Sequence, residues 1–276
     1  RWRYINPASE QNISAAQAIN HEITPNSINY NLKEKQLKVL IAGCGTGNQI
    51  VQAQRYKNAD ITAIDLSLSS LSYAHRKINE LGIQNVELVN MDILEVKLLE
   101  EKFDIIECVG VLHHMDHPSK GLKELLGILK NNGFLKLAVY SEIARQDIVQ
   151  ARKYIAKQQL DPSEKNIRNF RQKVISDELK DLKSLKNIVD FYSLSHCRDL
   201  CFHAKEHRFT INQLQETIES HQLNFLGFQL PQPVKSLYKS YFPEDKAQTN
   251  LQNWARFEEK YPNNFIKMYR FWVCKT

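Results

Sequence analysis

Short apolar runs alternate with longer amphipathic segments between residues 37 and 141. Five of the runs have the length and composition of buried strands: residues 37–42, 60–64, 86–89, 103–109 and 134–140. Three of the intervening segments repeat apolar residues at helical spacing: residues 48–56, 71–81 and 119–130. Gly82 and the sequence Asn131-Asn132-Gly133 are expected to end the last two helices. Strands separated by helices of this length predict βαβ units and a doubly wound, parallel α/β sheet.

The second half of the chain has a different pattern. Helical periodicity dominates residues 142–207 and predicts a helical insertion after the fifth strand. Beyond it the pattern predicts a helix, a strand, a helix and a strand: residues 210–221, 224–230, 251–261 and 268–274. Residues 1–36 are polar with little periodicity and are expected to form an N-terminal arm. The predicted organisation is therefore an arm, a core of residues 37–141 and 208–276, and the insertion.

Glycines stand where the first predicted strand ends, at the edge where open α/β sheets bind ligands. They alternate in the sequence Gly43-Cys44-Gly45-Thr46-Gly47. Glycine lacks a Cβ atom, so the backbone can turn sharply and approach a ligand closely. A dinucleotide fingerprint would require another glycine at Asn48. A nicotinamide oxidoreductase is one hypothesis for such a glycine loop, and this spacing disfavours it.

Two aspartates extend this pattern. Asp65 ends the second strand, about twenty residues after the glycines, where a carboxylate can accept hydrogen bonds from two ribose hydroxyls. Asp92 follows the third strand and can accept from the exocyclic amine of adenine, with Ile93 as an apolar neighbour of the ring. Each aspartate has a structural alternative as a cap or turn residue. Together with the glycines they indicate an adenosyl site.

These residues resemble the class I S-adenosylmethionine-dependent methyltransferases over about residues 37–141. The resemblance is carried by residues 39–47, Asp65, residues 91–93 and residues 109–114. It implies a Rossmann-like, seven-stranded, mostly parallel sheet with an antiparallel last strand, a helical lid after the fifth strand, and S-adenosyl-L-methionine as the cofactor. It also implies the cofactor-binding residues, which are Gly43, Cys44, Gly45, Thr46, Gly47, Asp65, Leu66, Met91, Asp92, Ile93, Val109 and Gly110.

By the same resemblance, the glycine loop holds the methionine part of the cofactor, Asp65 the ribose and Asp92 the adenine, while Gly110 lies beside the methionine end. A narrower resemblance, in residues 191–193 and 197–210, is to the methyltransferase region of bacterial proteins in which that region often follows tetratricopeptide repeats. It implies no particular acceptor. The chain starts at Arg1 rather than Met, which leaves room for such a repeat region before it.

One position departs from the family pattern. Class I methyltransferases usually have an acidic residue at the position of Ile41, where it helps to fix the amino group of the cofactor. An isoleucine cannot do this, so another group has to serve the ammonium, or the affinity is lower. The departure supports a second hypothesis, a non-catalytic S-adenosylmethionine-binding module that senses or scaffolds.

The candidate catalytic residues follow the fourth and fifth strands. His113 and His114 come after the fourth strand, and an imidazole titrates near neutral pH, as a general base should. Tyr140 ends the fifth strand, where it can line the acceptor pocket. As alternatives, the histidines cap a helix or pack beneath the cofactor, and Tyr140 is an ordinary strand-end aromatic.

Residues near the end of the insertion are candidates for the substrate pocket. His203, Glu206 and His207 are expected to close over the acceptor, or else to form a hydrogen-bonded corner. A metal site built from Cys197, Cys201 and these histidines lacks a standard zinc spacing, so we expect no metal. The insertion is interpreted as a lid that excludes water, with a dimerisation element or a packing cap as the alternative.

Composition narrows the class of protein. Residues 1–141 carry 15 basic and 15 acidic side chains, whereas residues 142–276 carry 22 and 16, which accounts for the net charge of +6. The excess is scattered and no Asn-Pro-Pro-Tyr motif is present, so a nucleic-acid substrate is disfavoured. Five cysteines without framework spacing, and no run of about 20 apolar residues, predict a cytoplasmic protein without a membrane span. The expected partner is a small-molecule or protein methyl acceptor.

Overall fold

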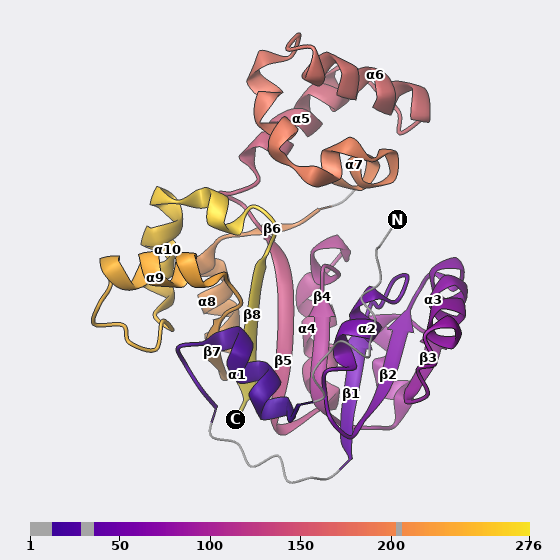
Figure 1. Ribbon diagram of the computed structural model, residues 1–276, viewed down its shortest axis with the longest axis vertical. Coiled ribbons are helices and arrows are strands. Elements are labelled where there is room, and N and C mark those ends of the chain that lie inside the picture. Colours follow the sequence, from indigo (N-terminus) through magenta and orange to yellow (C-terminus); the bar gives the residue numbers. More distant parts are fainter. Residues whose placement is uncertain (1–12, 29–35, 203–205) are drawn as a thin grey trace.

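The computed structural model describes residues 13–28, 36–202 and 206–276, which are built around an eight-stranded sheet (Figure 1). The strands are β1 (Leu37–Ala42), β2 (Ala59–Asp65), β3 (Val86–Asn90), β4 (Phe103–Val109), β5 (Leu129–Ser141), β6 (Arg208–Phe209), β7 (Leu223–Phe228) and β8 (Tyr269–Lys275). Their order is β3-β2-β1-β4-β5-β8-β7, and β6 pairs with β5. Strand β8 is antiparallel to both β5 and β7, whereas β1 to β5 pair in parallel. The predicted Rossmann-like sheet with an antiparallel last strand is confirmed, with the short β6 as an addition.

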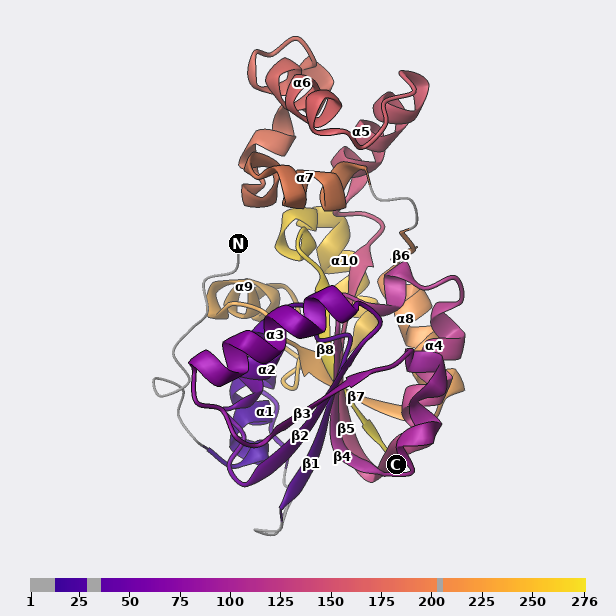
Figure 2. The ribbon, with the colours of Figure 1, turned by 90° about the vertical axis from the view of Figure 1, so that its right-hand side faces the viewer.

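Helices cover both faces of this sheet (Figure 2). On one face lie α1 (Ala15–Ile23), α2 (Asn48–Ala53) and α3 (Leu68–Glu80), which share a core with the apolar side chains of β1 and β2. On the other face lie α4 (Pro118–Ile128), α8 (Ile211–Ser220) and α10 (Leu251–Lys260). Helix α9 (Gln232–Tyr241) lies on the side of α1, and its Lys235 Nζ donates to the Glu22 carbonyl at 2.8 Å. Because both faces are covered, β1 is apolar in nearly every position, and the last four of its residues are 0% exposed.

The structure corrects some of the predicted bounds. The sequence Asn131-Asn132-Gly133 does not end a helix, because α4 already ends at Ile128 and these residues lie within β5. The strand starts early because Leu129 pairs with Phe103 of β4, a tertiary contact that local turn propensity does not reveal. Helix α2 ends at Ala53, three residues before the predicted end. Helices α1 and α9 were not predicted, although a capping box at Ser14 marks the start of α1.

The insertion forms a helical layer beyond the carboxyl ends of the parallel strands, at the top of Figure 1. It contains α5 (Gln146–Lys157), α6 (Glu164–Ile175), α7 (Leu194–Cys201) and two short 3₁₀-helical stretches, Lys180–Asn187 and Val189–Tyr192. Its buried side chains, such as Phe170 and Phe191, form an apolar cluster separate from the two cores that flank the sheet. In the described residues, no helix is long and apolar enough to cross a membrane.

A buried carboxylate joins β5 to α10 below this insertion. Glu258 is 0% exposed, and its two oxygens accept hydrogen bonds from Ser141 Oγ at 2.6 Å and from Tyr269 Oη at 2.5 Å. Burial raises the pKa of Glu258 above its ordinary value of 4.5, and the two hydrogen bonds oppose the shift only in part. Between the ordinary and the raised pKa the folded protein therefore binds more protons than the unfolded chain, so stability falls as pH rises through this window.

Glu258→Gln is expected to flatten this pH dependence, because glutamine keeps the shape of the side chain but carries no titrating proton. The Ser141 hydroxyl can accept from the new amide group, so the network survives. Urea unfolding of both proteins at a series of pH values from about 4 to 8 measures the two slopes. The Glu87→Gln variant, which alters an exposed carboxylate on β3, is the control and should keep the slope of the unmodified protein. Equal slopes for all three proteins would contradict the expectation.

Candidate functional site

The glycine loop joins β1 to α2 at the carboxyl edge of the sheet. Gly43, Gly45 and Gly47 all have positive φ angles, of 78°, 52° and 97°, which is the left-handed region that favours glycine. A Cβ atom on Gly43 would lie 2.4 Å from Val111 Cγ2, so no side chain fits there. A Cβ atom on Gly45 would meet nothing within 4 Å, so this residue presents bare backbone to open space. The loop therefore has the form of a cradle for a ligand.

Asp65 fixes this loop from the end of the neighbouring strand β2. Its Oδ2 accepts a hydrogen bond from the Gly45 N–H at 2.7 Å, and its Oδ1 accepts from the Ser67 N–H at 2.8 Å. A carboxylate has about four acceptor positions, so both oxygens keep capacity for a further donor. Leu66 beside it is 69% exposed and offers apolar surface next to that carboxylate.

The residues that follow β3 lie next along the same edge. Asp92 caps the 3₁₀ helix Ile93–Leu99 by accepting from the Leu94 N–H through Oδ1 at 2.9 Å. Asp92 therefore has the helix-capping role that was given as its structural alternative. Its other oxygen, Oδ2, accepts from no protein donor within the described ranges. Ile93 is buried, and the Met91 N–H donates to the Asp65 carbonyl at 3.2 Å. The two aspartates thus lie on adjacent strand ends.

The end of β4 forms the other side of the cradle. Gly110 has a φ of 81°, and its N–H donates to the Ala138 carbonyl of β5 at 3.1 Å. The Val109 carbonyl accepts from Gln49 Nε2 at 2.9 Å, which ties the first turn of α2 to this strand. Met268, just before β8, approaches Gly110 so closely that a Cβ atom there would lie 3.4 Å from Met268 Cε. Neither Gln49 nor Met268 belongs to a motif, and the sequence analysis missed both.

Ile41 is 0% exposed and packs in the apolar core, so it offers the cofactor no polar group. Glu107 of β4 lies directly beside it in the sheet register and is 2% exposed. The Glu107 carboxylate accepts from Arg55 Nη2 at 2.7 Å and from Tyr56 Oη at 2.6 Å. Although burial opposes ionisation, Arg55 and Lys136 hold the pKa of Glu107 below its usual value. The acid next to Ile41 therefore anchors the end of α2.

The three candidate catalytic residues meet beyond β4 and β5. The ring of His113 lies 3.9 Å from that of Tyr140 and 4.2 Å from that of His114, measured between centroids. His113 is 0% exposed, whereas His114 and Tyr140 are half-buried. Burial raises the pKa of Tyr140, and Arg145, whose guanidinium lies 3.5 Å from the ring centroid, opposes the shift only in part. Tyr140 is therefore a neutral phenol at neutral pH, and His114 is the more exposed imidazole.

Glu206 joins the insertion to this cluster. Its carboxylate is 1% exposed and accepts from Arg145 through Nε at 3.2 Å and Nη2 at 2.8 Å, and from Arg152 Nη2 at 2.8 Å. Arg208 Nη1 lies 3.8 Å away. The His207 N–H donates to the His113 carbonyl at 2.8 Å. Glu206 thus organises three arginines, and the predicted pocket residue His203 lies outside the described residues.

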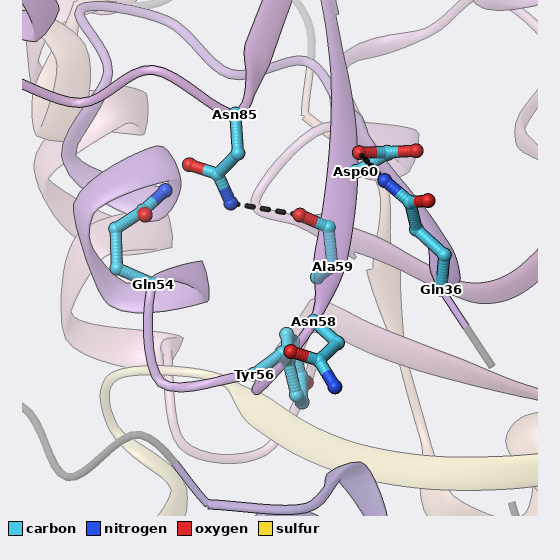
Figure 3. A pocket seen from close by; sticks show the side chains of 7 residues that line it. All are labelled: Gln36, Gln54, Tyr56, Asn58, Ala59, Asp60 and Asn85. Carbon is cyan, nitrogen blue, oxygen red and sulfur yellow. Dashed lines mark hydrogen bonds between the residues drawn. The ribbon is translucent and has the colours of Figure 1, made fainter. Parts of the chain in front are cut away.

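Other polar groupings lie apart from this edge. A hollow of about 660 Å³ is lined by Gln36, Gln54, Tyr56, Asn58, Ala59, Asp60 and Asn85 (Figure 3). It lies at the amino ends of β1 to β3, on the opposite edge of the sheet, and its amides bond to the strands, as Asn85 Nδ2 does to the Ala59 carbonyl at 2.8 Å. Among the described residues, no group of three or more His, Cys, Asp or Glu residues could hold a metal ion.

Comparison with known proteins agrees with this geometry. Residues 39–133 match the model of a family described as a methyltransferase domain. An uncharacterized protein from Synechococcus sp. is 31% identical over 80% of this chain and 55% of its own length. A ubiquinone biosynthesis O-methyltransferase from Histophilus somni is 30% identical over 42% of this chain and 51% of its own length. The chain therefore spans about half the length of these relatives.

A solved structure, PKMT2 from Rickettsia typhi in complex with AdoHcy, has a TM-score of 0.70 at 20% identity. The match covers 95% of this chain and 53% of that one, and it shows the same fold. The family match covers β1 to β4 and the start of β5, together with the glycine loop, Asp65 and Asp92. The edge that carries the glycine loop, Asp65 and Asp92 thus lies in the part of the chain that matches a methyltransferase domain.

Proposed function

We propose that the chain is an S-adenosylmethionine-dependent methyltransferase that transfers a methyl group to a small molecule or a protein side chain. The observation that carries the proposal is the meeting of His114 and Tyr140 at the sheet edge that holds the glycine loop. His114 follows β4 and Tyr140 lies near the end of β5, with their ring centroids 5.9 Å apart, and these two strands are joined by the bond from the Gly110 N–H to the Ala138 carbonyl. We expect His114, as a proton acceptor, and Tyr140, as a neutral phenol, to lie next to the methionine end of the cofactor.

The residues of the cradle fit S-adenosylmethionine. Gly45 presents open backbone, and Asp65 keeps acceptor capacity for the ribose hydroxyls. Leu66, which is exposed, would offer apolar surface to the adenine, and Asp92 Oδ2 can accept from its amine. Neither Ile41 nor Glu107 offers a free carboxylate to the ammonium, because Ile41 is apolar and the Glu107 carboxylate is already bonded to Arg55.

S-adenosylmethionine supplies an electrophilic methyl group, whose bond to sulfur breaks as a lone pair of the acceptor forms the new bond, leaving S-adenosylhomocysteine. His114 would take the proton that an oxygen or nitrogen acceptor loses. Tyr140 keeps its proton and would donate a hydrogen bond to the acceptor, while Arg145 fixes the tyrosine ring from behind. The helices of the insertion would act as a lid that excludes water from this edge.

His114→Ala is expected to lower the rate of S-adenosylhomocysteine formation by about 100-fold, because a positioned general base contributes at least this much. Cofactor affinity should not change. The rate is measured with radiolabelled S-adenosylmethionine and fractions of small molecules and proteins as acceptors. His117→Ala, an exposed residue in the same loop, is the matched control. If His114→Ala keeps the full rate, the histidine is not the base.

The second candidate function is a non-catalytic module that binds S-adenosylmethionine and senses or scaffolds. It is favoured by one observation, the apolar Ile41 where the family has an acid. Formation of S-adenosylhomocysteine by the unmodified protein would exclude it. Cofactor binding without turnover in any acceptor fraction would favour it over the enzyme.

Three further predictions accompany this proposal. They are the closeness to the methyltransferase region of tetratricopeptide-repeat proteins, the cytoplasmic location and the division into arm, core and lid. The lid prediction is supported by the separate apolar cluster of α5 to α7 and by its position beyond the carboxyl edge.

A further inference from the structure

A second hollow, of about 600 Å³, opens on the α1 side of the sheet. It lies between the last residues of α1, the segment that joins β7 to α9, and the residues that lead into β8. Leu230, Val234 and Ile266 give it an apolar wall. Its volume is in the range of small-molecule sites, roughly 300–1,000 Å³, which combine apolar walls with a few polar groups.

The hollow adjoins the expected methionine end of the cofactor. Met268 lines it and also approaches Gly110, where a Cβ atom would lie 3.4 Å from Met268 Cε, so this side chain reaches from the hollow towards the glycine at the end of β4. Arg270, which also lines the hollow, pairs in register with Ala138, the residue whose carbonyl accepts from the Gly110 N–H. Three neighbouring strand ends therefore place Gly110, Ala138 and Arg270 in one row across the sheet.

The charge of the hollow is positive. Lys267 and Arg270 both line it and are exposed, and in the part of the chain that the structure describes neither contacts a carboxylate. Glu22 is the acidic residue of the lining, but its carboxylate is held by Lys136 Nζ at 2.6 Å, by Arg55 Nη2 at 3.4 Å and by Trp272 Nε1 at 2.8 Å. Two cations are thus left without a counter-charge beside an apolar wall.

We propose that this hollow is the acceptor subsite and that it binds a small organic anion. The apolar body of the acceptor would pack on Leu230, Val234 and Ile266, and Lys267 and Arg270 would hold its carboxylate or phosphate, anions that arginine and lysine bind well. Met268 would lie against the part of the acceptor that faces Gly110. The proposal rests on the proposed function, and it adds the chemical class of the acceptor.

The test is isothermal titration of the full chain saturated with S-adenosylhomocysteine. The probes are hexanoate, hexyl phosphate and the neutral hexanamide, which share an apolar body and differ in the head group. We expect at least one of the two anions to bind and hexanamide to bind at least about tenfold more weakly, because the cations recognise the charge. The ratio between the two anions distinguishes a carboxylate from a phosphate acceptor.

The double variant Lys267→Gln/Arg270→Gln should weaken anion binding by at least about tenfold and leave S-adenosylhomocysteine binding unchanged. The matched control is Lys157→Gln/Arg256→Gln, which removes one exposed lysine and one exposed arginine elsewhere and should bind like the unmodified protein. Equal affinity for hexanoate and hexanamide, anion binding unaffected by the first variant, or no anion binding by the cofactor-saturated protein would each overturn the proposal. Failure of S-adenosylhomocysteine itself to bind would instead overturn the proposed function on which it rests.

Discussion

Asp65→Ala is expected to weaken binding of S-adenosylhomocysteine by about 1,000-fold. Two ribose hydroxyls donating to the carboxylate would contribute about 2 kcal/mol each, and every 1.4 kcal/mol is about tenfold in affinity. The same side chain also holds the Gly45 and Ser67 N–H groups, so its loss loosens the loop that cradles the ligand. Isothermal titration of the purified variant measures the effect.

Two controls separate binding from folding. Asp60→Ala removes a carboxylate from the same strand, near its amino end, and should leave the affinity unchanged. Asp65→Asn keeps one acceptor oxygen and should bind with intermediate affinity. If Asp65→Ala folds with an unchanged melting temperature and binds S-adenosylhomocysteine as tightly as the unmodified protein, the ribose does not lie at Asp65.

Glu206→Ala is expected to lower the free energy of unfolding by about 3–5 kcal/mol, the range for removing one partner of a buried ion pair. Glu206 is 1% exposed and contacts three arginines, two of them at 2.8 Å. Its loss would leave Arg145, which is 3% exposed, without its carboxylate. Urea unfolding, together with the rate of proteolysis of α5 to α7, measures the loss.

Glu142→Ala is the matched control for this variant. Glu142 also binds Arg208, at 2.8 Å, but its side chain is 38% exposed, so water can replace the contact. Its loss should cost no more than about 1 kcal/mol. Equal destabilisation by the two variants would show that Glu206 is an ordinary surface contact. Because Arg145 stacks on Tyr140, we also expect Glu206→Ala to disturb the candidate catalytic cluster.

The parts of the fold that the sequence predicted are those set by local pattern. The run of residues 37–42 predicted β1 to the residue, because a strand covered on both faces has to be apolar along most of its length. The start of β5 at Leu129 was not predictable in this way, since it depends on pairing with Phe103 of the neighbouring strand. Strand β6 was missed for the same reason, because its two residues form a strand by pairing with Tyr140 and Ser141 of β5.

In the candidate site, too, local pattern predicts some of the arrangement and tertiary packing decides the rest. His114 and Tyr140 could be expected to meet, because they lie at the carboxyl ends of strands that end at one edge of the sheet. A hydrogen-bonded corner was the alternative given for Glu206, but that Arg145 would be its partner could not be foreseen, since these residues lie 61 positions apart and their contact arises from packing. The hollow beside Met268 has no motif at all, because it is formed by α1, β7 and β8, which come from opposite ends of the chain.

A crystal structure of the full chain with S-adenosylhomocysteine is the most direct test of the central claim, that the carboxyl edge is a methyl-transfer site. We predict that the ribose hydroxyls bind Asp65, that the adenine lies beside Asp92 and Ile93, and that the sulfur faces Gly110. His114 and Tyr140 should lie on the side from which an acceptor would approach. Ligand bound elsewhere, or its sulfur turned away from His114 and Tyr140, would contradict it.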